Sequence, residues 1–121
     1  MSENIILKKT FDLAVEAVKV SRELQMKKSE YIISKQIMRS ATSVGAMTRE
    51  AQQAESKADF IHKMSIALKE ANETEYWIEL LTASNLIDGI DSNSMSASLK
   101  ESVKMLTSIV KTAKSNLKTK P

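Results

Sequence analysis

Five lysines near the C-terminus have the spacing that most clearly suggests a function for this chain. They follow one another at intervals of four, seven, three and four residues: Lys100, Lys104, Lys111, Lys114 and Lys118. At about 100° per residue in an α-helix, these positions fall within an arc of about 80°. A line of ammonium groups on a rigid helix could neutralise phosphates and bind RNA or DNA without reading its sequence. The alternative is that a lysine-rich helix face serves only solubility.

The charge distribution sets this lysine line apart from other cations. Three cations near the N-terminus are weaker candidates for the same role: Lys8, Lys19 and Arg22. The acidic Asp12 lies among them. The net charge is only +3, but residues 91–121 hold six lysines against two acids, whereas residues 56–90 hold three lysines against six acids. The sequence therefore predicts a molecule with a basic end and an acidic middle.

Residue combinations that support catalysis or metal binding are scarce. His62 is the single histidine and there is no cysteine, so a Ser-His-Asp triad has no visible basis and zinc ligands are too few. One Asp59-x-x-His62 pair falls short of the two Glu-x-x-His motifs of di-metal bundles. Two glycines cannot form a phosphate-binding loop. We predict no enzyme, no cofactor and no metal; an enzyme built on His62 or Glu75 is the least favoured alternative.

Apolar residues three and four positions apart recur along nearly the whole chain, and this spacing predicts helices. Two glycines, one proline and only 4% aromatic residues also favour helix over sheet. We predict one all-α domain over residues 1–121, an antiparallel up-down-up-down four-helix bundle with short connections. The helices are expected at about residues 4–27, 29–53, 57–84 and 93–118.

Local signals place the beginnings of two of these helices and one close contact. Ser29 is the expected N-cap of the second helix. Ser56, followed three residues later by Asp59, resembles a capping box for the third. Gly45 lies inside the second helix, where glycine costs about 1 kcal/mol relative to alanine. This predicts a close packing contact at Gly45, and the alternative is a loop there.

The first expected helix carries two apolar stripes, more than one core face requires. One stripe consists of Leu7, Phe11, Ala14 and Val18. The other consists of Ile6, Leu13, Ala17, Val20 and Leu24. A second apolar surface calls for a second packing partner, which predicts self-association. The rival function is a scaffold or adaptor that binds a protein through this surface and the acidic face of residues 57–84.

Residues 33–46, Ile-Ser-Lys-Gln-Ile-Met-Arg-Ser-Ala-Thr-Ser-Val-Gly-Ala, carry a family resemblance together with Arg49-Glu50-Ala51 and residues 60–67. These segments resemble the four-helix-bundle proteins encoded in 23S ribosomal RNA intervening sequences. That family is similar to the accessory variability determinant of diversity-generating retroelements. The resemblance covers most of the chain and is densest between residues 35 and 81.

The resemblance implies an antiparallel four-helix bundle that assembles as a homopentameric ring. It also implies a basic surface suited to RNA or DNA and, in the retroelement branch, a reverse-transcriptase partner. Among polar residues, Arg39, Glu50 and Glu73 are expected to be structural, and no catalytic residue can be transferred. Glu75 falls within an apolar stripe, so we expect it at the stripe's edge or paired with Arg39.

The cellular setting follows from two absences in the sequence. The N-terminus lacks a basic segment followed by an apolar one, so no signal peptide is visible. No apolar run approaches the roughly 20 residues that span a bilayer. We therefore expect a cytoplasmic, non-enzymatic homo-oligomer that binds nucleic acid through its lysine face and has no membrane partner.

Overall fold

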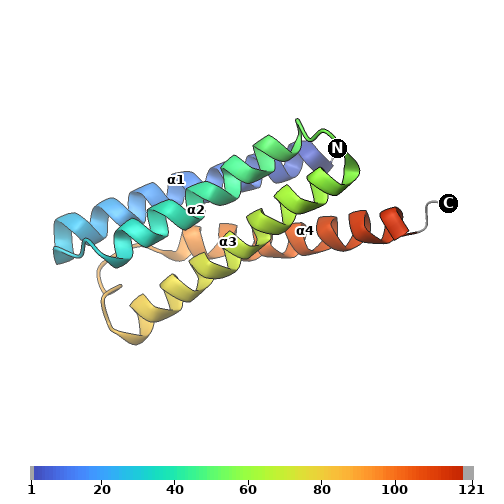
Figure 1. Cartoon of the computed structure of the whole chain (residues 1–121). Coiled ribbons are helices and arrows are strands. Elements are labelled where there is room, and N and C mark those ends of the chain that lie inside the picture. Colours follow the sequence, from blue (N-terminus) through green and yellow to red (C-terminus); the bar gives the residue numbers. More distant parts are fainter. Residues whose placement is uncertain (1, 119–121) are drawn as a thin grey trace.

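Four α-helices form the structure, a computed structural model that describes residues 2–118 and the side chains of residues 5–117. Their bounds are α1 Ser2–Lys28, α2 Ile33–Ala51, α3 Lys57–Ala83 and α4 Asn93–Lys118. Each connection reverses the chain, so that consecutive helices run antiparallel (Figure 1). The chain is therefore all-α, and the prediction of an up-down-up-down four-helix bundle is confirmed.

Each helix packs against the next one along the chain, and α4 returns to pack against α1. In the described residues, no Cα atom of α1 lies within 8 Å of one in α3, and the same holds for α2 and α4. Figure 1 shows α1 and α2 running closely side by side, whereas α3 is inclined to α4. The bundle thus has one tightly aligned pair of helices and one pair that diverges.

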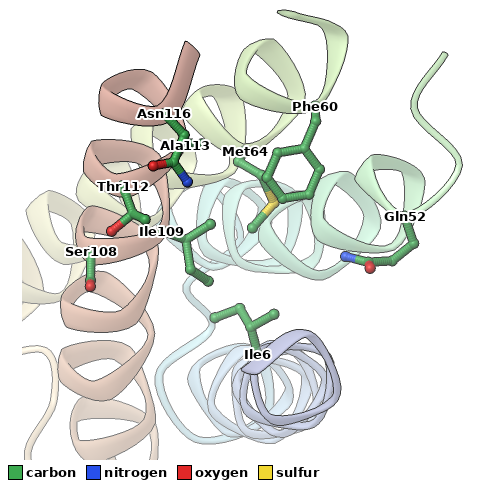
Figure 2. Close-up of a pocket in the computed structure, with 9 residues that line it drawn as sticks. All are labelled: Ile6, Gln52, Phe60, Met64, Ser108, Ile109, Thr112, Ala113 and Asn116. Atoms are coloured by element: carbon green, nitrogen blue, oxygen red, sulfur yellow. The ribbon is translucent and has the colours of Figure 1, made fainter. Parts of the chain in front are cut away.

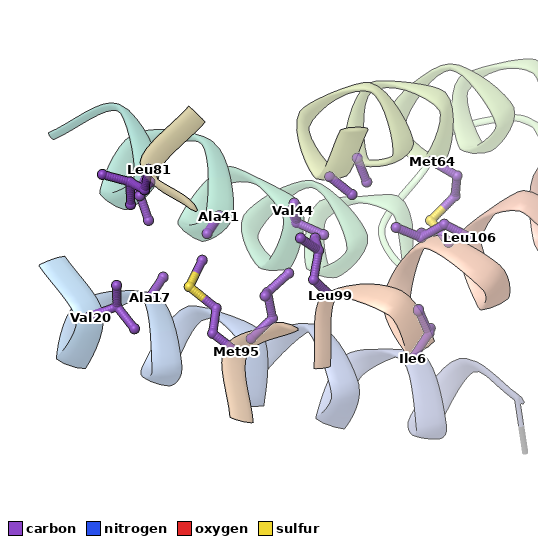
Figure 3. Packing of buried hydrophobic residues seen from close by; sticks show 14 of the residues in the cluster. Ile6, Ala17, Val20, Ala41, Val44, Met64, Leu81, Met95, Leu99 and Leu106 are labelled. Atoms are coloured by element: carbon purple, nitrogen blue, oxygen red, sulfur yellow. The ribbon is translucent and has the colours of Figure 1, made fainter. Parts of the chain in front are cut away.

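A single hydrophobic core extends along the bundle (Figure 3). Of the two apolar stripes on α1, the one that contains Ile6, Leu13 and Leu24 is fully buried. Phe11, from the other stripe, remains 55% exposed. Hydrophobic burial contributes about 1.5–3 kcal/mol per large side chain, so the first stripe holds α1 in the bundle and the second faces outward.

Small residues and hydroxyl pairs bring α2 close to its neighbours. The side-chain oxygens of Thr10 and Thr48 are 3.0 Å apart between α1 and α2, and those of Ser40 and Thr74 are 2.8 Å apart between α2 and α3. A Cβ added at Gly45 would lie 3.3 Å from the backbone oxygen of Thr10. Gly45 is helical, as the apolar spacing predicted, and its missing side chain allows α1 and α2 to approach.

Two helix ends differ from the expectation. Ser29 is not the N-cap of α2, because it adopts the left-handed conformation with φ 52° just after α1, and α2 begins only at Ile33. The Glu30 carboxylate instead accepts hydrogen bonds from the backbone N–H groups of Ile32, Ile33 and Ser34 at 2.7–3.1 Å. At the start of α3, the Ser56 hydroxyl accepts from the Asp59 N–H, which is one half of a capping box, and the Asp59 carboxylate accepts from the N–H of Glu55 instead of Ser56.

Candidate nucleic-acid interface

Helix α4 presents a lysine face about 120° around the helix from its buried face. Met95, Leu99, Leu106 and Val110 are buried in the core and anchor the helix. The lysine face, which is exposed, consists of Lys100, Lys104, Lys111 and Lys114. The fifth predicted residue, Lys118, belongs to the same helix, but its side chain lies outside the described residues. Burial on one side of α4 therefore holds the ammonium groups of the other side toward solvent.

The described members of the lysine face make no ion pair with any other described residue. The acid closest to them in sequence, Glu101, bonds to Lys9 of α1 at 2.8 Å. This hydrogen bond and the carboxylate charge raise the pKa of Lys9 above its ordinary value of 10.5. Glu101 is thus engaged across the α1–α4 contact, and the lysine face keeps its charge available to a ligand.

The predicted cations of α1 are placed differently. Lys8 lies 3.2 Å from Asp12, and Lys19 lies 3.4 Å from Glu16. Arg22 is exposed and has no ion pair among the described residues. Each lysine therefore has a carboxylate about one helical turn away, which reduces the net field that a phosphate would meet.

Arg39 belongs to a polar cluster across the α2–α3 contact. Its guanidinium pairs with Glu73 and, at 3.2 Å, with Glu70. Trp77 Nε1 donates to the same Glu73 carboxylate at 3.0 Å. The expected alternative of an Arg39–Glu75 pair is wrong, because α3 turns Glu70, Glu73 and Trp77 toward α2, whereas Glu75 lies half-buried beside α4.

Sequence reasoning missed Glu70 and Trp77 as partners in this cluster. The available signal is their spacing from Glu73, three residues before it and four after it, which places all three side chains on one face of α3. Glu50, also expected to be a structural residue, is 57% exposed and lies 3.9 Å from Lys63. Its contact is a loose surface pair, which is worth little on general grounds.

A pocket of about 390 Å³ opens at the end of the bundle where α1 begins and α4 ends (Figure 2). Ile6, Phe60 and Met64 form much of its apolar wall, and Gln52 and Asn116 supply amide groups. None of its lining residues is titratable at neutral pH. The pocket therefore lacks the acid and base that proton-transfer catalysis requires.

The described residues also bear on metal sites and membrane spans. No group of three or more His, Cys, Asp or Glu side chains is arranged to hold a metal ion in the part of the chain that the structure describes. Across residues 2–118, none of the helices combines the length and apolarity required to cross a bilayer.

The chain is thus a four-helix bundle with a cationic face on its last helix, α4. A profile of the family described as 23S rRNA-intervening sequence protein matches residues 2–108. The chain belongs to this family. No curated protein matches the chain.

A solved structure shares both the fold and much of the sequence. It is the 1.70 Å crystal structure of a protein with unknown function from the S23 ribosomal protein family of Bacteroides thetaiotaomicron VPI-5482. The two sequences are 47% identical, with a TM-score of 0.86, and the match covers 92% of this chain and 99% of the other. This similarity shows the four-helix fold over nearly the whole bundle.

Proposed function

We propose that the protein is a non-enzymatic, homo-oligomeric bundle that binds RNA or DNA through the lysine face of α4, without reading sequence. The observation that carries this proposal is the contrast in ion pairing. The described lysines of α4 are exposed and have no carboxylate partner, whereas Lys8 and Lys19 on α1 do. Unpaired ammonium groups displace the counterions around phosphates at little cost to the protein's own contacts.

The geometry of α4 suits a nucleic-acid backbone. The segment from Lys100 to Lys114 is about 21 Å long at 1.5 Å per residue. One strand of a duplex carries a phosphate about every 3.4 Å along its axis, so this segment spans several phosphates. No aromatic residue alternates with the lysines, and base stacking is therefore not part of the proposal.

Self-association would multiply this modest surface. The family resemblance suggests a homopentamer, in which five lysine faces would act together through multivalency. Partly exposed apolar side chains at the open end of the bundle, among them Ile5, Met105 and Ile109, support an additional packing contact. Met105 and Ile109 lie on α4 beside the lysine face, in a shallow hollow that they share with Lys104, and Ile5 lies on α1.

Charge reversal with a matched control tests the proposal. We expect the triple substitution Lys104→Glu, Lys111→Glu and Lys114→Glu to weaken binding of a short structured RNA and a DNA duplex by at least about tenfold at about 50 mM salt. Fluorescence anisotropy gives the affinity, and light scattering after size exclusion gives the oligomeric state. The control changes the net charge equally at exposed lysines elsewhere: Lys28, Lys35 and Lys69. Equal effects of the two triples, or no binding at low salt, would contradict the proposal.

A second candidate function is a protein scaffold or adaptor, for which the outward apolar stripe of α1 is the supporting observation. The resemblance to the accessory variability determinant suggests a reverse transcriptase as one such partner. Capture of a purified reverse transcriptase that persists at high salt, by a protein that binds no polyanion, would favour this function over nucleic-acid binding.

A further inference from the structure

The two ends of the lysine face have different neighbours on α3. At the Lys100 end, a hollow of about 180 Å³ lies between α3 and α4, and its lining includes Glu75 and Glu79 on α3 together with Lys100 itself. At the other end, a hollow of about 200 Å³ is lined in part by Lys57 on α3 and Ala113 on α4, and none of its lining residues is acidic. Of these two hollows, only the one at Lys100 contains carboxylates.

Helical geometry explains why one side of α3 is basic at its start and acidic near its end. Lys57 and Glu75 are 18 residues apart, which is five turns at 3.6 residues per turn, so that both side chains leave α3 in the same direction. Glu79 follows Glu75 by four residues and points about 40° to one side. Because α3 and α4 run antiparallel (Figure 1), the end of α3 lies beside the beginning of α4, where Lys100 is located.

The charges of Glu75 and Glu79 are not neutralised within the described part of the bundle. Neither carboxylate has an ion pair with another described residue, and Glu79 is exposed. Glu101, the acid next to Lys100 in the sequence, differs in this respect because it is bonded to Lys9 at 2.8 Å. A phosphate bound at Lys100 would therefore meet two uncompensated negative charges, which oppose its binding.

This repulsion decreases along the lysine face. At 1.5 Å per residue, Lys104, Lys111 and Lys114 lie about 6, 16 and 21 Å from Lys100 along the axis of α4. Interactions between exposed charges are screened over about 8 Å at physiological ionic strength. Glu75 and Glu79 thus act strongly at Lys100 and weakly at the far end of the face. Lysines that are equivalent by their spacing therefore differ in the attraction that each offers to a phosphate.

We propose that Glu75 and Glu79 form one boundary of the nucleic-acid interface, so that the bound strand contacts Lys104, Lys111 and Lys114 but not Lys100. This inference rests on the proposed function and adds to it the position of the strand on α4. The segment from Lys104 to Lys114 is about 15 Å long, which corresponds to about four phosphates along one strand of a duplex. The two carboxylates touch no phosphate in this arrangement and exclude it through their charge.

The dependence of affinity on Lys100 tests this boundary in the full-length protein. Fluorescence anisotropy with a short structured RNA and a DNA duplex at about 50 mM salt compares two single substitutions. We expect Lys111→Ala to weaken binding at least about threefold and Lys100→Ala to change it by less than about 1.5-fold, because only Lys111 contacts a phosphate. Equal losses in the two variants would overturn the boundary and leave the proposed function intact. Binding that survives the triple charge reversal of Lys104, Lys111 and Lys114 would overturn both.

Neutralisation of the boundary gives the reverse experiment. Glu79→Gln should raise the affinity about twofold, and Glu75→Gln combined with Glu79→Gln should raise it about fivefold, because Lys100 can then bind a phosphate. The slope of log affinity against log salt concentration should steepen by about one in the double variant. The control is Glu50→Gln, which removes the same charge from an exposed side chain on α2, a helix with no Cα atom within 8 Å of α4 in the described residues.

A double-mutant cycle separates the recruitment of Lys100 from a change in net charge. The gain produced by Glu75→Gln and Glu79→Gln should disappear when Lys100→Ala is added. The proposal is overturned if the gain persists without Lys100, or if Glu50→Gln raises the affinity as much as Glu79→Gln. Circular dichroism verifies that each variant remains helical, and Glu79→Gln, at an exposed position, provides the test if the double variant fails to fold.

Discussion

Helices α1 and α4 pack against each other, and both carry exposed lysines. The exposed lysines Lys8 and Lys19 of α1 are paired with carboxylates, whereas those of the lysine face are not. On α1, Lys8 and Lys19 lie beside Asp12 and Glu16. On α4, the lysine face has no carboxylate partner among the described residues, and Glu101 is turned toward α1. The number of cations on a helix is therefore a poor guide to the charge that the helix offers to a ligand. The local supply of carboxylates decides whether that charge reaches a ligand.

The inner faces of the same two helices differ as well. The hydroxyls of Thr10 and Ser21 on α1 have hydrogen-bond partners on α2. Ser102 Oγ on α4 is buried and has no hydrogen-bond partner in the described part of the chain. Helix α1 is thus joined to α2 by specific polar contacts, whereas the described contact of α4 with α1 combines apolar packing with the surface ion pair between Lys9 and Glu101.

Truncation of a buried side chain of α4 should have the largest effect, a loss of folding stability. Leu106 is fully buried, and Leu106→Ala should lower the free energy of unfolding by about 2–5 kcal/mol through lost burial and a cavity. Denaturant unfolding followed by circular dichroism gives this value. An unfolding free energy within about 0.5 kcal/mol of the wild type would show that α4 is not held by its core side.

Neutral substitution of the lysine face should change the salt dependence of binding. Lys104→Ala, Lys111→Ala and Lys114→Ala together should reduce the slope of log affinity against log salt concentration by about two to three. The affinity at low salt should fall by about ten- to 100-fold. Titrations at several salt concentrations measure both quantities, and an unchanged slope would mean that these lysines contact no phosphate.

Removal of the unpaired hydroxyl should stabilise the bundle. Ser102→Ala should raise the free energy of unfolding by about 1 kcal/mol, because a buried polar group without a partner carries a desolvation penalty. Ser21→Ala on α1 is the contrasting variant and should lower it, since Ser21 donates to the Ser34 carbonyl oxygen at 3.1 Å. A loss of stability in both variants would indicate that Ser102 has a partner in solution.

Neutralising the acids of α1 should leave its exposed lysines without carboxylate partners, as on the lysine face of α4. Asp12→Asn combined with Glu16→Gln frees Lys8 and Lys19 from their carboxylates. We expect RNA affinity at low salt to rise by about two- to fivefold, less than the α4 effect, because exposed charges act through a screened field. The same titrations measure the change, and no gain would show that α1 lies too far from the bound strand.

Removal of the ion pair between Lys9 and Glu101, which joins α1 to α4, should have the smallest effect on folding stability. The Glu101 carboxylate raises the pKa of Lys9, so the contribution of this pair is fully present below pH 10.5 and is lost as the pH rises through the higher pKa of the folded state. Lys9→Met should therefore be slightly less stable than the wild type at pH 8, and the difference should disappear in strongly alkaline solution. Thermal melts over this range measure it, and a constant difference would exclude an ionic cause.

Several of these features could be read directly from the sequence. Apolar spacing predicted the four helices, the short connections predicted their antiparallel order, and the Ser56 and Asp59 pair predicted the start of α3. The lysine intervals predicted a common face on α4, because helical geometry converts spacing into direction. In each case the determining interactions are local, within one helix or one turn, and a sequence contains them in full.

Other features depended on which helices became neighbours. Either stripe of α1 could have faced the core, and only packing against α2 and α4 left Phe11 outside. Arg39 paired with Glu70 and Glu73 rather than Glu75, because the rotation of α3 is set by all of its core contacts together. The sequence by itself determined the helices and the lysine face, through short-range periodicity. The tertiary structure alone decided the ion-pair partners of Arg39 and which stripe of α1 faces outward, since both depend on residues that are distant in the chain and meet in the folded bundle.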